Sequence, residues 1–285
     1  VRGTVEAWLR ENDLPGWDPR TGAGFARHLL VRSAQSGAEV LASLVTTPED
    51  LPDASGLVER LRAAHPEVVG VVHAVNGGRA EISSGLESET LWGRPFLLEK
   101  VAGITLKVSV DAFFQTNTLA AEKLYAVIRR WTKRAAPATL YDLYGGMGSI
   151  AFACADLVGE VHSVENVPEA SEDGRHNARA NDIGNVVFHT RKVEDYLRDL
   201  VSEQGAFPED AAVVVDPPRA GMHPKALRRL LELAPRRVLY VSCKPAMLAR
   251  EMPAFLETCD VSGMSAVDMF PHTPHVELVV QFERR

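Results

Sequence analysis

Cysteine is scarce in this sequence: its 285 residues include only three, and no two of them form a CxxC pair. An odd number of scattered thiols argues against a disulfide framework and against a zinc site, so we expect no metal centre. Apolar runs are short as well, and none approaches the ~20 residues that a membrane helix needs. The start of the chain carries no signal-peptide pattern, and we expect a cytoplasmic protein without membrane association.

An excess of positive charge is lacking too. The chain has 31 basic and 38 acidic residues, a formal net charge of −7, which argues against coating nucleic acid by overall attraction. One stretch departs from this average. Between Arg219 and Arg250, eight basic residues stand against a single acid, Glu232, a local charge of +7. Such a stretch is either a solvated helix surface or a local surface for RNA, and the sequence alone leaves both interpretations open.

Neither internal repeats nor low-complexity tracts interrupt the chain, and its 46% of hydrophobic residues suits a globular protein. Residues 1–108 alternate short strands with one helix. The segments HLLVRSA and AEVLASLVTT predict a hairpin around Ser36-Gly37. ASGLVERLRAAH predicts an amphipathic helix, and VVGVVHAVN predicts a buried strand. We expect residues 1–108 to form a small α+β subdomain without a catalytic motif.

From residue 109 onward the pattern changes to strands separated by longer helical stretches. The segment TNTLAAEKLYAVIRRWTKRA predicts a helix. Six further segments have the composition of strands: ATLYDLY, EVHSVEN, NVVFHTR, AAVVVDPP, RRVLYVSC and HVELVVQF. Strands that alternate with helices predict a doubly wound, mostly parallel α/β sheet over residues 109–285.

A glycine-rich turn follows the first of these strands. In YDLYGGMGSIA, glycines such as Gly146 allow close backbone approach to a ligand, and a helix N-terminus follows. The same residues satisfy G-x-G-x-x-A, so a nicotinamide-dependent dehydrogenase fits this turn as well as a methyltransferase does. Glu165 ends the next strand. There its carboxylate would accept hydrogen bonds from both ribose hydroxyls of an adenosine, whether that of NAD or that of S-adenosylmethionine.

Asp216-Pro217-Pro218 separates these two interpretations. Two prolines stiffen the turn after the strand and project Asp216 at the carboxyl edge of the sheet, where ligands of open α/β sheets bind. An acidic residue followed by two prolines suits a methyltransferase that acts on a nucleobase and has no role in hydride transfer. Methyl transfer is therefore the better interpretation.

Six motifs now carry a resemblance to a known family. They occur in the family's order and cover about residues 105–285: DAFFQTN, LYDLYGGMGS, SVENVPEASEDGRHNARAN, VVVDPPRAGMHPKAL, VLYVSCKPAMLARE and VDMFPHTPHVELVVQFER. With these motifs the chain resembles the bacterial RNA uracil-C5-methyltransferases, which form 5-methyluridine in tRNA or ribosomal RNA. The resemblance implies a class I methyltransferase fold over residues 109–285, S-adenosylmethionine as cofactor, RNA as partner, and an RNA-facing subdomain in residues 1–108.

The resemblance also implies roles for individual residues. Cys243 would add to C6 of uracil, and Glu277 would act as the base at C5. The implied cofactor ligands are Gln115, Tyr144, Gly146, Ser149, Glu165 and Asp216. We further expect substrate contacts from Arg219, Lys244 and His275.

The chemistry explains why these residue types are needed. Uracil C5 is a poor nucleophile, and a thiolate that adds to C6 turns the ring into an enolate whose C5 accepts a methyl group. A base must then remove the C5 proton so that the thiol leaves. We expect the surroundings of Cys243 to lower its pKa, with help from Lys244. We expect Cys154 and Cys259 to be buried and inert, and Glu277 to be a site residue because an unpaired carboxylate in an apolar strand is costly.

The chain departs from the family pattern at three places. Lys244 replaces the usual asparagine of the S-C-N-P motif, and Gly145 replaces a cysteine, a change that we expect to be harmless. The N-terminal β-barrel and the four-cysteine iron–sulfur region of larger members are missing. Because the sequence starts at Val1, we expect either a removed N-terminus or a compact form that recognises RNA through residues 1–108 and 219–250.

The sequence thus predicts an S-adenosylmethionine-dependent methyltransferase that makes 5-methyluridine in RNA. An RNA cytosine-C5-methyltransferase, which uses the same thiol addition, is the nearest alternative. A Rossmann dehydrogenase and a catalytically silent RNA-binding protein are alternatives of other classes.

Overall fold

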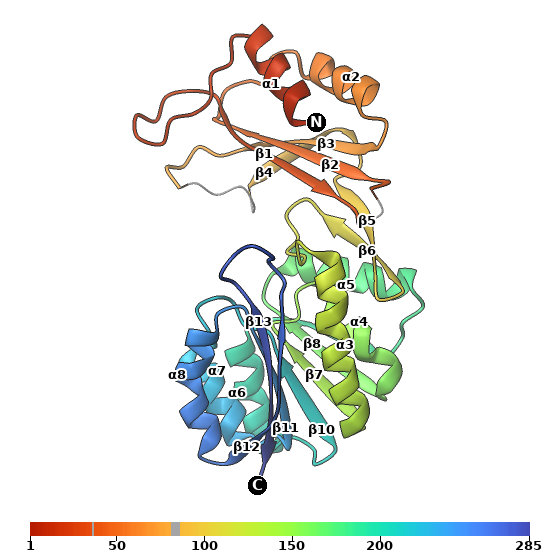
Figure 1. Ribbon diagram of the computed structural model, residues 1–285, viewed down its shortest axis with the longest axis vertical. Helices are drawn as coiled ribbons and strands as arrows, with labels where there is room; N and C mark the ends of the chain where they lie inside the picture. Colours follow the sequence, from red (N-terminus) through yellow and green to blue (C-terminus); the bar gives the residue numbers. More distant parts are fainter. Residues whose placement is uncertain (36, 81–85) are drawn as a thin grey trace. The chain divides into compact units, whose positions relative to one another are not determined.

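The computed structural model describes residues 1–35, 37–80 and 86–285. The chain divides into two compact units (Figure 1). Unit 1 comprises residues 1–100 and 105–112, and unit 2 comprises residues 101–104 and 113–285.

Unit 1 contains a four-stranded sheet of order β1-β2-β3-β4. Its elements are α1 (Arg2–Glu11), β1 (Ala26–Ser33), β2 (Val40–Thr46), α2 (Ala54–Ala64), β3 (Val68–Val75) and β4 (Glu87–Gly93). A hairpin follows, made of β5 (Phe96–Val101) and β6 (Ile104–Ser109), which pair only with each other among the described strands. Strands β1 and β2 pair antiparallel, which confirms the predicted hairpin, although Ser36 of its turn lies outside the described residues.

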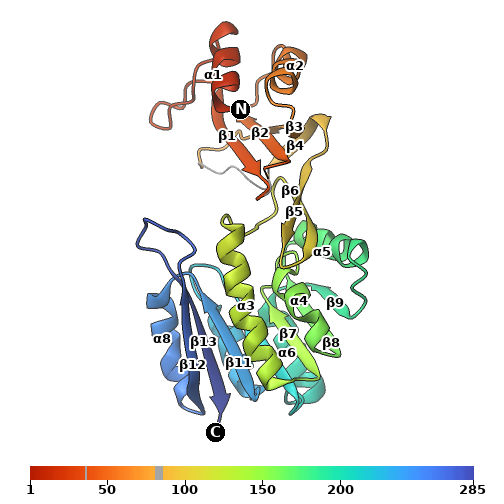
Figure 2. The same cartoon turned by 45° about the vertical axis from the view of Figure 1, so that its right-hand side comes forward.

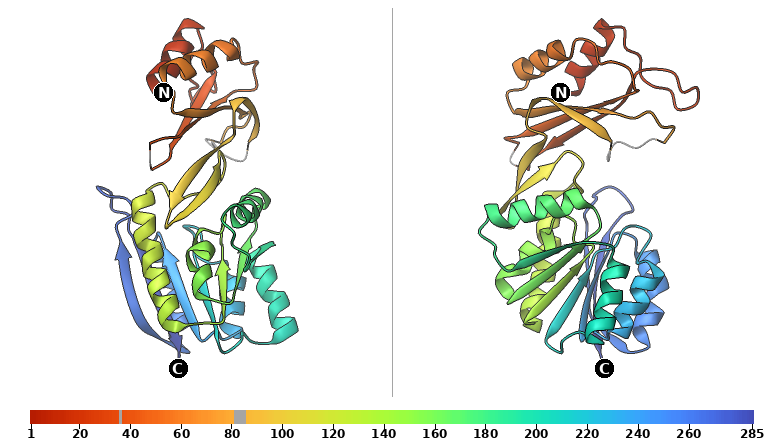
Figure 3. Two further views of the ribbon diagram at one scale, coloured as in Figure 1. Left: turned by 90° about the vertical axis from the view of Figure 1, so that its right-hand side faces the viewer. Right: turned by 180° about the vertical axis from the view of Figure 1, so that it is seen from behind.

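Two helices cover one face of this sheet (Figure 3). Helix α2 confirms the amphipathic helix expected from the sequence, and its Leu57 and Leu61 pack with Trp8 of α1 in the core of unit 1. The expectation of a single helix in this part of the chain is wrong, because α1 also forms. Its N-cap, Val1, makes no side-chain capping bond, and only Val5 and Trp8 of the helix are buried, so its sequence carries a weak helix signal.

Unit 2 is built on a seven-stranded sheet of order β12-β13-β11-β10-β7-β8-β9. Its elements are α3 (Thr118–Ala135), β7 (Thr139–Leu143), α4 (Ser149–Cys154), the 3-10 turn η1 (Ala155–Leu157), β8 (Glu160–Glu165), α5 (Pro168–Ala180), β9 (Val186–Thr190), α6 (Val193–Gln204), β10 (Ala211–Val215), α7 (Pro224–Glu232), β11 (Arg237–Ser242), α8 (Pro245–Leu256), β12 (Cys259–Val267) and β13 (Glu277–Arg284). Helices α3, α4 and α5 lie on one face and α6, α7 and α8 on the other (Figures 1 and 3).

The sheet is mostly parallel, as the sequence predicts. Strand β7 pairs parallel with β8 and β10, and further parallel pairs extend the sheet to β9 and β11. Strand β13 runs antiparallel between β11 and β12 (Figure 2). Because the chain winds outward from β7 first through β8 and β9 and later through β10 and β11, the winding reverses between β7 and β10. Ligands of such sheets bind at that reversal, outside the carboxyl ends of the strands.

The sequence does not predict β12. Only the two end residues of this edge strand are buried, Gly263 lies in its middle, and its register is irregular between Val261 and Gly263. The core of unit 2 instead draws on the strands that the sequence does predict, and Val213, Val215 and Phe282 are fully buried. In the parts of the chain that the structure covers, no helix combines the length and the apolar character needed to cross a membrane.

Candidate active site

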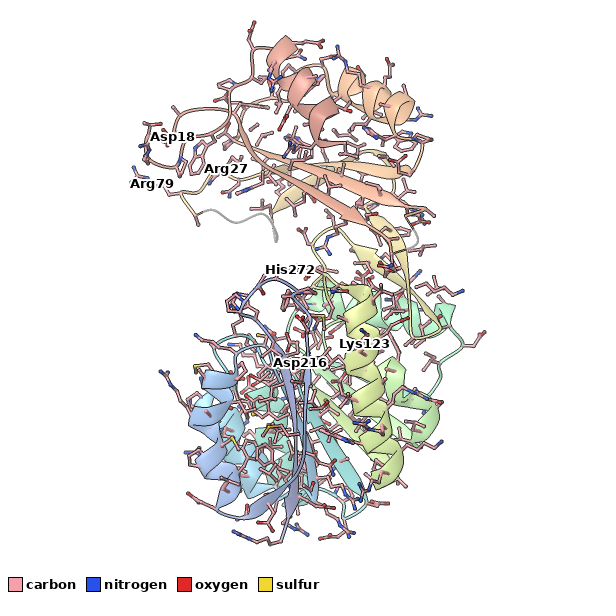
Figure 4. The ribbon with its side chains drawn as sticks, in the orientation of Figure 1. Asp18, Arg27, Arg79, Lys123, Asp216 and His272 are labelled. Atoms are coloured by element: carbon pink, nitrogen blue, oxygen red, sulfur yellow. The ribbon has the colours of Figure 1, made fainter. Side chains whose placement is uncertain are left out.

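The winding reversal brings two loops together. Leu143, the last residue of β7, pairs with Val215, the last residue of β10, and the Asp216 amide donates a hydrogen bond to the Leu143 carbonyl oxygen over 3.2 Å. The glycine loop begins at Tyr144, so it starts directly beside Asp216. Figure 4 shows Asp216 at the carboxyl edge of the unit 2 sheet, and His272 on the β12–β13 loop.

The glycine loop leaves open space at one glycine and packs tightly at another. Gly146 has φ +56°, and a Cβ added there would meet nothing within 4 Å. Gly148 has φ +86°, and a Cβ there would lie 3.0 Å from the Phe188 ring. Both conformations favour glycine. Gly148 is therefore needed for packing against β9, whereas Gly146 leaves room for a ligand.

Glu165 is held by backbone amides at the end of β8. Its Oε2 accepts a hydrogen bond from the Gly146 amide at 3.0 Å, and its Oε1 accepts one from the Val167 amide at 2.8 Å. A carboxylate oxygen has capacity for a further donor, so both oxygens remain able to accept hydroxyl groups. The carboxylate is thus oriented by the glycine loop itself.

A cavity of about 160 Å³ lies at the same edge. It is lined by Tyr144, Val164, Asn166, Lys192, Val193 and Glu194. Burial raises the pKa of Tyr144 to about 12, so this phenol stays protonated at neutral pH. Sequence reasoning missed Asn166, Lys192 and Glu194. Asn166 directly follows β8, and Lys192 and Glu194 lie at the N-terminal end of α6, shortly after β9. Because ligands bind beyond the carboxyl ends of the strands, these positions could have been predicted from the strands alone.

Two other predicted cofactor ligands lie on α3 and α4 or just before them. Gln115 precedes α3, whose N-cap Asn117 accepts a hydrogen bond from the Ala120 amide at 3.1 Å. The Asn117 side chain also donates to the Met269 carbonyl oxygen at 3.2 Å, which ties the segment of Gln115 to the β12–β13 loop. Ser149 begins α4, and its side chain interacts with Tyr125 of α3.

The strand register places Cys243 and Glu277 next to each other. In the antiparallel pair of β11 and β13, the last paired residues at this end are Ser242 and Leu278, and Cys243 and Glu277 are the residues next to them. Glu277 lies close enough to Cys243 to affect its pKa. Cys243 is partly exposed, and Glu277 is only 3% exposed. Among the described residues, Glu277 makes no side-chain hydrogen bond or ion pair.

Burial and, after it, neighbouring carboxylates raise the pKa values of Cys243 and Glu277. Burial and, secondarily, Asp216 raise the pKa of Glu277 to about 7, and burial likewise raises the pKa of Asp216 to about 7. Burial also raises the pKa of Cys243, with further increases from Glu277 and Asp216 and an opposing effect of Arg219. The expectation that the surroundings lower the pKa of Cys243 is therefore wrong. Two carboxylates face the thiol, and the cation that acts on it is Arg219.

The three predicted substrate contacts are all exposed. Arg219 follows the Pro217-Pro218 turn, close enough to Cys243 to affect its pKa. Lys244 is the N-cap of α8, and its amide donates to the Ser242 hydroxyl at 3.2 Å. His275 lies in the β12–β13 loop, where its ring meets the Phe270 ring edge-on with the centroids 6.2 Å apart.

The basic stretch 219–250 does not form one surface. Arg219 and Lys244 lie at the carboxyl edge of the sheet, but Arg237 begins β11 at the opposite edge. Arg237 pairs there with Glu283 at 2.9 Å, and Arg229 donates to the Glu194 carbonyl oxygen. Only part of the local charge of +7 therefore lies near Cys243.

At Gly145, neighbouring side chains leave little space for a Cβ atom. A Cβ there would lie 2.2 Å from the Ser163 Oγ and 2.9 Å from Asp142 Oδ2. The Ser163 hydroxyl also donates to Asp142 at 3.5 Å, and burial, followed by the charge of Asp216, raises the pKa of Asp142 to about 7. The cysteine of the family pattern does not fit beside Ser163.

The two thiols outside the site are buried, as expected. Cys154 is fully buried in α4, where burial raises its pKa to about 12, and Cys259 is 5% exposed at the start of β12. Within the described ranges, no group of three or more His, Cys, Asp or Glu side chains could hold a metal ion.

The chain is similar to known proteins both in sequence and in structure. The model of the tRNA (uracil-5-)-methyltransferase family matches residues 99–285. The chain belongs to this family. Membership agrees with the predicted fold class and with the resemblance seen in the sequence motifs.

Relatives extend the match over the rest of the chain. An uncharacterized RNA methyltransferase of Caldanaerobacter subterraneus subsp. tengcongensis is 37% identical over 96% of this chain and 60% of its own length. One from Listeria innocua is 34% identical over the whole chain and 62% of its own length. The chain thus spans about 60% of the length of the curated relatives it matches.

A solved structure is also similar. The crystal structure of Pyrococcus abyssi tRNA (uracil-54, C5)-methyltransferase in complex with S-adenosyl-L-homocysteine superimposes with a TM-score of 0.78 at 26% sequence identity. The match covers 98% of this chain and 65% of that one. The doubly wound fold of unit 2 is therefore that of an S-adenosylmethionine-dependent methyltransferase.

Proposed function

We propose that the protein methylates C5 of a uridine in tRNA or ribosomal RNA, with S-adenosylmethionine as methyl donor, Cys243 as nucleophile and Glu277 as base. The observation that carries this proposal is that β11 and β13 bring a partly exposed thiol and a buried carboxylate to the same end of their pair, with Glu277 near enough to affect the pKa of Cys243. Membership in the family supports the same activity and argues against a dehydrogenase. We also propose that residues 1–108 face the RNA and that residues 109–285 form the catalytic domain.

The residues of the carboxyl edge fit the cofactor. The open space at Gly146 admits a ligand next to the Glu165 carboxylate, whose oxygens are oriented to accept ribose hydroxyls. The adjacent cavity with Tyr144 would enclose the base. Asp216, Gln115 and Ser149 would complete the contacts. S-adenosylmethionine, when bound, would supply the methyl group of its sulfonium centre to a carbon nucleophile, with S-adenosylhomocysteine as the leaving group.

Cys243 would activate the uracil ring. Its thiolate forms a bond to C6, the electrons of the C5–C6 double bond move toward O4, and C5 becomes nucleophilic enough to take the methyl group. Because the pKa of Cys243 is raised, only a small fraction of the thiol is ionised in the free protein at neutral pH. Arg219 opposes this increase, so a position of Arg219 close to the thiol favours the thiolate.

Glu277 would complete the reaction. After C5 has gained the methyl group, the carboxylate removes the C5 proton, the C5–C6 double bond forms again, and the bond between C6 and sulfur breaks. A pKa of about 7 suits a base at neutral pH. The position opposite Cys243 suits the two side chains to act on neighbouring ring atoms.

Trapping the adduct tests this proposal. The protein is incubated with labelled S-adenosylmethionine and RNA that contains 5-fluorouridine. In this RNA, fluorine replaces the C5 proton, and because a base cannot remove it, the adduct cannot break down. We expect a labelled complex that survives denaturation, and none with Cys243→Ala. With ordinary RNA, Glu277→Ala should accumulate the methylated adduct. If wild-type protein and Cys243→Ala behave alike, the proposed mechanism is wrong.

The modified nucleoside identifies the substrate base. Digestion of the product RNA should release 5-methyluridine. Release of 5-methylcytidine would favour the cytosine-C5 alternative, and cofactor binding without any methylated product would favour a silent RNA-binding protein.

A further inference from the structure

Glu251 of α8 links three segments around Cys243. Its Oε2 accepts a hydrogen bond from the Tyr240 hydroxyl at 2.7 Å, and its Oε1 accepts one from the Met222 amide at 2.9 Å. Tyr240 belongs to β11, three residues before Cys243. Met222 belongs to the β10–α7 loop, six residues after Asp216. One carboxylate therefore joins the strand that leads to the thiol, the helix that follows it, and the loop beside it.

The β10–α7 loop is shaped for this contact. The Gly221 amide donates to the Pro218 carbonyl oxygen at 2.8 Å, which closes a turn, and Gly221 has φ +84°. A Cβ at Gly221 would lie 2.1 Å from Glu251 Oε1. The close approach of the loop to α8 thus requires glycine at this position. Tyr240 is 1% exposed, so its hydroxyl needs the carboxylate as a partner.

We propose that Glu251 is a positioning residue that fixes the turn carrying Arg219 relative to Cys243. The sulfur must approach C6 at roughly 3–3.5 Å, and a misplacement of about 1 Å costs about 100-fold in rate. Without Glu251, both hydrogen bonds of its carboxylate are lost, and the contact of the Tyr240 hydroxyl with the Met222 backbone is left to join the loop to β11. The turn is then held less firmly, and Arg219 can move away from the thiol. This inference rests on the proposed function, since Glu251 acts only through the residues that perform the reaction.

The test measures the single-turnover rate of adduct formation on RNA containing 5-fluorouridine, at saturating cofactor and at varied RNA concentration. We expect Glu251→Ala to lower the maximal rate by about 10- to 100-fold with a smaller change in the RNA concentration at half-maximal rate. Glu251→Gln should recover part of the rate, because the amide oxygen still accepts one of the two hydrogen bonds. Tyr240→Phe, which removes only one bond, should lose about 3- to 10-fold. Glu257→Ala, an exposed glutamate at the end of α8, is the matched control and should stay within about twofold.

Each variant is also checked for folding by thermal unfolding and S-adenosylhomocysteine binding. A folded Glu251→Ala that reacts within about twofold of wild type overturns the proposal. If Glu251→Ala does not fold, Glu251→Gln and Tyr240→Phe decide, and wild-type rates in both overturn it.

Failure of the proposed function is recognised separately, because wild-type protein would then form no adduct. In that case the readout is the pH dependence of Cys243 alkylation by iodoacetamide, followed by mass spectrometry. Because Arg219 lowers the pKa of Cys243, movement of Arg219 away from the thiol should shift the alkylation midpoint of the Glu251 variants to higher pH. Such a shift supports the positioning role, and an unchanged midpoint overturns it.

Discussion

The burial of Glu277, which we propose as the base, carries a cost for the stability of the fold. An unfolded chain loses this proton at a pH of about 4.3, whereas the folded protein holds it until about pH 7. Between these values the folded state binds more protons than the unfolded state. The contribution of Glu277 to stability therefore falls as the pH rises through this window, and it stays at its low value above pH 7.

Replacing the carboxyl group should stabilise the protein. We expect Glu277→Gln to raise the free energy of unfolding by about 1–3 kcal/mol at pH 8, and to leave it nearly unchanged at pH 4, where the wild-type carboxyl is protonated in both states. Chemical denaturation at both pH values measures the difference. Glu203→Gln, an exposed change on α6, serves as the control. An equal effect of Glu277→Gln at both pH values would contradict the raised pKa.

The same group should control the rate of the last step. We expect decay of the methylated adduct on ordinary RNA to speed up as the pH rises through about 7 and then to level off, because only the carboxylate accepts the C5 proton. Quenched samples taken across the range measure this decay. A rate that is flat between about pH 6 and 8 would argue that another group is the base.

At the residue scale, the sequence indicates which residues belong to the candidate site better than it predicts their pKa values. Cys243 and Glu277 stand out through their motifs. Burial raises the pKa of Cys243, and Glu277 and Asp216, which are distant from it in sequence but lie near the thiol, raise it further. Adjacent Lys244 suggested the opposite direction, and only the fold shows that Arg219 is the nearby cation that acts.

At the scale of an element, two glycines of the glycine loop should have different effects when they are replaced: one on the stability of the fold and the other on ligand binding. We expect Gly148→Ala to lower the free energy of unfolding by about 2–3 kcal/mol, because the methyl group combines a left-handed backbone with displacement of Phe188. Gly146→Ala meets open space and should cost only about 1 kcal/mol. It should instead weaken S-adenosylhomocysteine binding by about tenfold or more, since its methyl group enters the ligand space. Thermal unfolding and calorimetric titration compare the two variants.

A second prediction concerns the pair of Gly145 and Ser163. Gly145→Cys should destabilise the protein by about 2–4 kcal/mol, because the new side chain collides with the Ser163 hydroxyl above buried Asp142. Adding Ser163→Ala should recover a large part of this loss. Denaturant titration of the single and double variants measures the coupling, and simple additivity of the two changes would contradict the contact.

Elements with a strong buried pattern are predictable from the sequence, and exposed ones are not. Five consecutive buried residues make β10 recognisable. Edge strand β12 has mostly exposed or half-exposed positions, and α1 presents only two buried side chains, so neither stands out. The missed cavity residues lie in the loop after β8 (Asn166) and at the start of α6 (Lys192 and Glu194), where position after a strand is informative and composition is not.

For the whole molecule, a net charge of −7 means that the RNA binding we propose must come from a local surface. RNA affinity falls as the salt concentration rises, and the slope of log association constant against log salt concentration is therefore negative. We expect Arg219→Ala and Lys244→Ala each to make this slope shallower by about 0.7–1, as loss of one phosphate contact does. Arg236→Ala, an exposed arginine of the same stretch at the opposite edge of the sheet, is the matched control and should leave the slope unchanged. Filter binding over a range of salt concentrations measures all three, and equal slopes for every variant would place the RNA elsewhere.

The antiparallel insertion of β13 sets an order of events during synthesis. Strand β12 leaves the ribosome first, yet among the described strands it pairs only with β13, so it cannot join the sheet until the later strand arrives. Until then the nascent sheet exposes one apolar edge of β11, a hazard for association between chains. The loops after β7, β8 and β10, which we propose to bind the cofactor, are already translated at that stage. Under the proposed mechanism the chain therefore acquires its base, Glu277, in the same step that closes the sheet, and a nascent chain that lacks β13 is still chemically incompetent.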